Sequence, residues 1–262
     1  MPYASVNGAE LYYETYGEGP PVVFAHGVGG NHASWYQQLP FFSRFYRVIS
    51  FDQRGFGNTE DPQGLGRGAF VEDLRALLDH LEVARTSLVA QSMGGSTCMG
   101  FTVRYPERVS ALVMADTLVG ITLPEPLRTR QQQNAEATRN LSQLERVLSK
   151  SLPLRDAAKA ELYLQMASFN RSNVTRFNMA GTPAAPITMD EVTAAAQKVP
   201  MLFLVGEEDI LQPVEIVAAA SRLVPGAELA VVPGAGHSVY FEQPEVFNYQ
   251  VHAFLSKVLP RE

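Results

Sequence analysis

Residues 88–97 read LVAQSMGGST, and the order of residue types in this stretch predicts its local fold. An apolar run ends at Ala90 and is typical of a buried strand, and Ser92 follows almost at once. Gly94 and Gly95 come next, and residues without a side chain let a helix start close to neighbouring backbone. A serine at such a sharp turn is either an exposed nucleophile or the cap of the following helix.

Strand and helix patterns alternate on both sides of this stretch. Asn7 and Gly8 predict a hairpin turn between two antiparallel strands near the start of the chain. Six further strands are predicted from short apolar runs within residues 20–27, 46–55, 86–92, 109–116, 199–209 and 227–237. Helical patterns lie between or after them at residues 31–45, 70–83, 93–106, 213–224 and 244–259. This alternation predicts an α/β fold, a mostly parallel eight-stranded sheet with helices on both faces.

The alternation is interrupted between residues 119 and 198. This segment has no strand signal, and its helical patterns cover residues 131–150, 154–169 and 188–199. It is too long for an ordinary connection between two strands. We therefore predict a core domain formed by residues 1–118 and 199–262, with residues 119–198 inserted after the sixth strand as a helical cap.

Polar residues follow four of the predicted strands. They are HGVGG at 26–30, Ser92, GEED at 206–209 and GAGH at 234–237. Parallel sheets bind ligands at the carboxyl ends of their strands, so these residues are expected to meet. The chain order is serine, then acid, then histidine, as in the α/β-hydrolase family. The chain resembles that family over essentially its whole length, also at DQRGFGNT (52–59), GEEDILQP (206–213) and GAGHSVYFEQPE (234–245).

The resemblance implies a role for each of these residues. Ser92 is the expected nucleophile, His237 the base that takes its proton, and Asp209 the carboxylate that orients the histidine. Asp116, which ends the strand at residues 109–116, is the alternative acid, because some family members recruit their acid from that strand. Ala90 replaces the first glycine of the familiar Gly-x-Ser-x-Gly pattern, and its small side chain satisfies the same steric need.

The oxyanion that forms during acyl transfer needs backbone N–H donors. By resemblance, these are the amides of Val28 and Met93. His26 is expected to order the loop before Val28 and to lie near the substrate. A substrate pocket is also predicted from apolar residues, which could instead pack the cap onto the core: Trp35, Met166, Phe169, Phe177 and Met179.

Composition narrows the classes of function. Apolar residues make up 46% of the 262 residues, enough for a large core, and the net charge of −6 argues against nucleic acid or an anionic membrane as partner. No apolar run approaches the ~20 residues that span a bilayer, and the N-terminus lacks a signal-peptide pattern, so a cytoplasmic location is expected. The single cysteine, Cys98, cannot form an internal disulfide. We predict no metal and no cofactor, and we leave a homodimer open.

These features predict a serine hydrolase that cleaves small to medium carboxylic esters through an acyl-enzyme. A serine nucleophile argues against the dehalogenases and epoxide hydrolases of the family, which use aspartate. Lactonases acting on enol-lactones or acyl-homoserine lactones, C–C bond hydrolases and perhydrolases remain alternatives. C–C bond hydrolases usually have tryptophan shortly after the histidine, where this chain has Ser238, Val239 and Tyr240. A ligand-binding receptor on the same scaffold is the non-enzymatic alternative.

Overall fold

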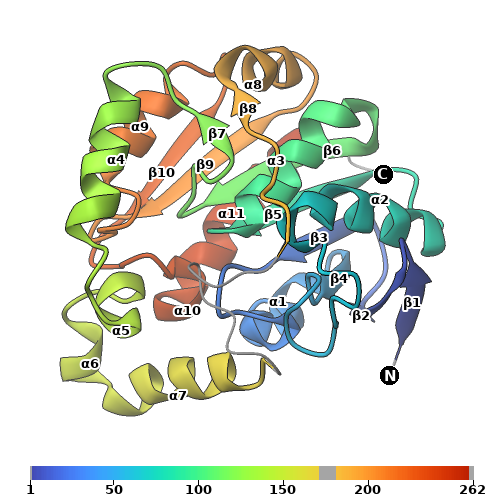
Figure 1. Ribbon diagram of the computed structural model, residues 1–262, viewed down its shortest axis with the longest axis horizontal. Helices are drawn as coiled ribbons and strands as arrows, with labels where there is room; N and C mark the ends of the chain where they lie inside the picture. Colours follow the sequence, from blue (N-terminus) through green and yellow to red (C-terminus); the bar gives the residue numbers. More distant parts are fainter. Residues whose placement is uncertain (1, 171–180, 260–262) are drawn as a thin grey trace.

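A single eight-stranded sheet organises the protein, as seen in the computed structural model, which describes residues 2–170 and 181–259 (Figure 1). The strand order is β1-β2-β4-β3-β5-β6-β9-β10. The pairs β1–β2 and β2–β4 are antiparallel, and the other five pairs are parallel. The strands are β1 (Tyr3–Val6), β2 (Ala9–Tyr16), β3 (Pro21–Ala25), β4 (Arg47–Phe51), β5 (Thr86–Gln91), β6 (Val109–Ala115), β9 (Met201–Gly206) and β10 (Glu228–Val232). The mostly parallel sheet predicted from the sequence is confirmed.

Local sequence explains the first hairpin and the central strand. Asn7 and Gly8 have φ values of 48° and 75°, the left-handed conformation that a tight hairpin turn between β1 and β2 requires. Every residue of β5 is buried. A strand in the middle of a parallel sheet has helices on both faces, which accounts for its continuous apolar pattern.

Two large apolar clusters form most of the core, one on each face of the sheet. The first cluster includes side chains from α2 (Phe70–His80), α3 (Gly94–Arg104), α8 (Met189–Ala196) and α9 (Val214–Ser221). The second includes side chains from α1 (Leu39–Phe42), α10 (Val239–Glu242) and α11 (Pro244–Val258). Short 3₁₀ turns also lie in the connections, at His32–Trp35, Gly66–Ala69 and Pro106–Arg108.

Within residues 119–198 the structure has β7 (Ile121–Thr122), α4 (Leu127–Ala137), α5 (Gln143–Val147), α6 (Leu152–Arg155), α7 (Ala157–Ser168), β8 (Ile187–Thr188) and α8. Helices α5, α6 and α7 lie together beyond one end of the sheet (Figure 1). The expectation of no strand here was wrong, because β7 and β8 pair over two residues each, too short to leave a sequence pattern. The boundaries of the cap stay a prediction, and α8 buries Val192 and Ala195 in the first core cluster.

Candidate active site

Ser92 occupies a strained turn between β5 and α3. Its φ of 49° lies in the left-handed region, which is uncommon for residues other than glycine. A Cβ atom on Gly94 would clash with the carbonyl oxygen of Ala25, and one on Gly27 would lie 2.9 Å from Cβ of Ser92. Glycine at both positions therefore lets α3 and the loop after β3 approach the serine closely.

His237 lies between Ser92 and Asp209. Its Nε2 is 2.9 Å from Ser92 Oγ, and its Nδ1 is 2.9 Å from Asp209 Oδ2. The other carboxylate oxygen, Asp209 Oδ1, accepts the backbone N–H groups of Leu211 at 2.8 Å and Gln212 at 2.9 Å. A carboxylate only accepts, so the histidine proton belongs on Nδ1, which leaves Nε2 free to accept from the serine hydroxyl.

The environment of His237 favours its protonated form. Burial alone would lower its pKa, but the charge and hydrogen bond of Asp209 outweigh burial and raise the pKa above its ordinary value. The charge of Asp116 adds to this rise, whereas the positive charge of Arg146 opposes it. The imidazolium that forms when His237 takes a proton is thus stabilised in place.

Asp116, the alternative acid, has different partners. Its Oδ1 accepts the N–H of Gly206 at 3.0 Å, and its Oδ2 accepts the N–H of Val239 at 3.1 Å. Burial and the nearby charge of Asp209 raise the pKa of this carboxyl well above its ordinary value. Asp116 therefore binds the backbone of the two loops that carry Asp209 and His237, and the carboxylate on the imidazole is that of Asp209.

Two further side chains hold the loop of His237, and the sequence analysis did not identify either. Gln91 donates from Nε2 to the carbonyl oxygen of His237 at 2.8 Å. The buried carboxylate of Glu242 accepts the N–H of Gly236 at 2.8 Å and the N–H of Ser149 in the cap at 3.1 Å. The available signals were positional: Gln91 directly precedes the serine, and Glu242 lies within the quoted stretch 234–245.

The loop at residues 26–31, here called the oxyanion loop, is fixed from both sides. His26 Nε2 accepts the N–H of Gln53 at 3.0 Å, so its proton lies on Nδ1, which donates to the Gly27 carbonyl at 2.8 Å. Burial lowers the pKa of His26, consistent with a neutral ring. Asn31 donates from Nδ2 to the Met166 carbonyl at 3.0 Å and so joins the loop to α7. His26 is buried and has a partner at each ring nitrogen, so it orders the loop.

The structure places the two predicted oxyanion donors on separate segments beside Ser92. Met93 immediately precedes α3, and Val28 is in the oxyanion loop, where it packs against the cluster of Met93, Phe56 and Phe70. Within residues 2–170 and 181–259, neither the Val28 nor the Met93 amide donates to another protein group. Both donors are therefore available to a ligand beside Ser92.

The predicted pocket residues are placed less favourably. Trp35 is 0% exposed and packs on Phe24 and Tyr240, so it belongs to the core and lines no open pocket. Phe169 is 61% exposed, and its ring lies at the surface at the end of α7. Met166 is buried in the second core cluster. An apolar pattern in the sequence does not distinguish a core residue from a pocket or surface residue. Phe177 and Met179, also predicted for the pocket, lie outside the described residues.

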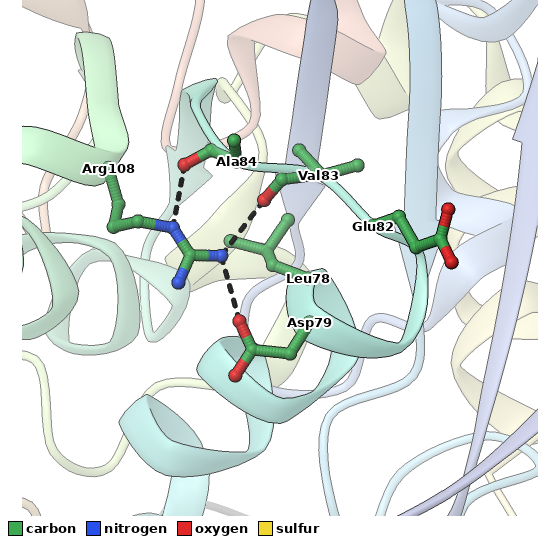
Figure 2. A pocket seen from close by; sticks show the side chains of 6 residues that line it. All are labelled: Leu78, Asp79, Glu82, Val83, Ala84 and Arg108. Carbon is green, nitrogen blue, oxygen red and sulfur yellow. Dashed lines mark hydrogen bonds and ion pairs between the residues drawn. The ribbon is translucent and has the colours of Figure 1, made fainter.

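Other candidate sites carry little chemistry. Burial raises the pKa of the Cys98 thiol, which keeps it protonated and unreactive. In the described part of the chain, no group of three or more His, Cys, Asp or Glu side chains could hold a metal ion. Among the same residues, no helix is both long and apolar enough to cross a membrane. Figure 2 shows a pocket beside Arg108, with a volume of about 450 Å³. Its lining residues precede β5 and β6, whereas Ser92 follows β5, so the pocket lies at the opposite end of these strands from Ser92. The guanidinium there is already bound to Asp79 and to the carbonyls of Val83 and Ala84.

Comparison with known proteins agrees with this architecture. A thermophilic esterase from Thermogutta terrifontis is 29% identical, with a TM-score of 0.79 over 98% of this chain and 97% of its own. Est816, an N-acyl homoserine lactone degrading enzyme, is 27% identical, with a TM-score of 0.78 over 97% and 100%. A 2-hydroxy-6-oxo-2,4-heptadienoate hydrolase of Pseudomonas putida is 29% identical over 95% of this chain and 94% of its own length. Residues 20–244 match the profile of one family, and the chain therefore belongs to the alpha/beta hydrolase fold family.

Proposed function

We propose that this protein is a serine hydrolase that cleaves small to medium carboxylic esters through an acyl-enzyme intermediate. The observation that carries the proposal is the line of two 2.9 Å contacts from Ser92 Oγ through His237 to Asp209 Oδ2. A serine hydroxyl is a weak nucleophile near neutral pH and needs a base within hydrogen-bond distance. His237 meets that need, and its Nδ1 proton is held by Asp209.

In this mechanism Ser92 Oγ attacks the ester carbonyl carbon while His237 Nε2 takes the hydroxyl proton. The negative charge that develops on the carbonyl oxygen is stabilised by the free amides of Val28 and Met93. His237 then gives the proton to the leaving alkoxide, and the acyl group stays on Ser92. A water molecule repeats the attack with the same base, which releases the acid and restores the serine.

The likeness to a thermophilic esterase supports the ester substrate. The likeness to an enzyme that degrades N-acyl homoserine lactones supports a lactone as the second candidate. A lactone is a cyclic ester, so the same residues would act. The one difference is that the alkoxide leaving group stays covalently attached to the acyl chain. C–C bond hydrolysis is a further alternative, supported by the heptadienoate hydrolase of Pseudomonas putida.

Substitution of Ser92 tests the proposal. We expect Ser92→Ala to abolish hydrolysis of 4-nitrophenyl esters and labelling by a serine-directed phosphonate, with the melting temperature unchanged. The matched control is Ser87→Ala on β5, the strand that leads to Ser92, because the Ser87 hydroxyl is buried without a hydrogen-bond partner. Ser87→Ala should retain both ester hydrolysis and labelling by the phosphonate. Turnover in Ser92→Ala, or no turnover and no labelling in the wild type, would reject the proposal and favour a different chemistry or a binding protein.

A further inference from the structure

Helix α5 of the cap lies between the two loops that serve the candidate active site. A Cβ atom on Gly29 of the oxyanion loop would come within 3.0 Å of Nε2 of Gln143, the first residue of α5. Just past the end of α5, Ser149 donates to Glu242 of α10, which also binds the residue before His237. In Figure 1, α5 and α10 are neighbours. The helix therefore spans from the oxyanion loop to the histidine loop.

Arg146, within α5, carries a positive charge that no described residue neutralises. In residues 2–170 and 181–259 no carboxylate lies within ion-pair distance of its guanidinium. Its Nε is buried and has no hydrogen-bond acceptor. A guanidinium cannot lose its proton in a protein, and a buried N–H without an acceptor costs about 1–3 kcal/mol.

The nearby carboxylates are already occupied. Glu145, the neighbour of Arg146 in the chain, binds the Ser142 backbone at 2.8 Å as part of a capping box. Glu242 binds the amides of Gly236 and Ser149. Three other cap cations have partners: Arg128 pairs with Glu125, Arg139 with Glu136, and Lys159 with the Glu242 carbonyl. The remaining described cap cations are exposed to solvent, unlike the Nε of Arg146: Arg130, Lys150, Arg155 and Lys198.

Arg146 lies on the helix that contacts both loops of the candidate site. Its positive charge is among those that act on His237, and it opposes protonation of the imidazole. An unpaired cation at this position attracts an anion that enters with the substrate. A planar guanidinium matches a carboxylate in shape, with two parallel N–H···O bonds.

We propose that Arg146 recognises a free carboxylate on the substrate, so that the preferred esters are monoesters of dicarboxylic acids. This inference rests on the proposed ester hydrolysis at Ser92 and adds the class of acyl group. A carboxylate is favoured over a phosphate dianion because Asp209 already places a negative charge beside His237. A single negative charge balances the single guanidinium.

The test compares esters of equal chain length. Mono-4-nitrophenyl adipate and suberate are each paired with the neutral hexanoate and octanoate, and kcat/KM is measured for the wild type and Arg146→Gln. A hydrogen bond to a charged group is worth about tenfold or more in affinity. In at least one pair, Arg146→Gln should lower kcat/KM for the dicarboxylic monoester about tenfold and leave that for the neutral ester within about twofold. Arg146→Lys should recover part of the loss.

Arg139→Gln is the matched control, since that arginine is in the cap, exposed and paired with Glu136. Arg139→Gln should leave kcat/KM unchanged for both esters. If Arg146→Gln lowers kcat/KM equally for both esters, the arginine contributes only packing by its aliphatic side-chain carbons. That result would overturn the inference without contradicting ester hydrolysis. If the wild type cleaves no ester, calorimetric binding of adipate against hexanoate decides. Adipate binding weakened about tenfold in Arg146→Gln supports the carboxylate site, and unchanged binding rejects it.

Discussion

Replacing each of two neighbouring carboxylates by its amide separates their roles. In Asp209→Asn, the amide oxygen can keep the two backbone bonds to Leu211 and Gln212, so the loop should hold its shape. The amide NH₂ then faces His237 Nδ1 in place of Oδ2 at 2.9 Å. A donor there requires an unprotonated Nδ1, so the proton moves to Nε2, which can no longer accept from Ser92. The expected loss in kcat is about 10⁴-fold, or about 5.5 kcal/mol of transition-state stabilisation.

In Asp116→Asn, by contrast, one backbone N–H of Gly206 or Val239 faces a donor and loses its acceptor. The expected cost is about 1–3 kcal/mol in the free energy of unfolding. The imidazole keeps its Asp209 partner, so kcat should fall by less than about 100-fold. Steady-state hydrolysis of 4-nitrophenyl hexanoate at pH 7 and urea unfolding measure both quantities. A loss of about 10⁴-fold in Asp116→Asn, with Asp209→Asn close to wild type, would refute this assignment.

Further predictions concern pH and the oxyanion loop. Because Asp209 raises the pKa of His237 and the base must be neutral to act, kcat/KM should rise with pH through a midpoint above about 6.5. Arg146→Gln should move that midpoint upward, since its charge lowers the pKa of His237; a downward move would contradict the argument. Gly27→Ala should lower kcat about 100-fold, as measured with 4-nitrophenyl esters, because the new Cβ would clash with the Gln91 side chain, lie 2.9 Å from Ser92 Cβ and displace the loop that carries Val28. An unchanged kcat would show that the loop adapts.

The fold and the order of the candidate catalytic residues were predictable from the sequence. Continuous apolar runs such as β5 identify buried parallel strands, and the polar residues just after them must share one edge of the sheet. The choice between Asp209 and Asp116 was not predictable in this way, because both follow apolar strands. It depends on where each side chain points, and Asp116 has a φ of 51° that directs its carboxylate to backbone amides.

The burial of individual side chains was harder to predict. Trp35 and Phe169 are both aromatic residues in helical patterns, yet one is fully buried and the other is 61% exposed. Arg146 reads in the sequence as a charged residue on a solvated helix face. Its buried, unpartnered Nε depends on how α5 packs over the core, which no local pattern encodes.

The carboxylate of Glu242 has a consequence for how new variants of this protein could be built. It binds the cap at Ser149 and the histidine loop at Gly236 at the same time. A cap taken from a relative and grafted onto this core would therefore contact Glu242, the same side chain that holds the loop before His237. Chimeras that preserve a backbone N–H opposite Glu242 should keep turnover, whereas those that lack it should lose rate even when the new cap suits the new substrate.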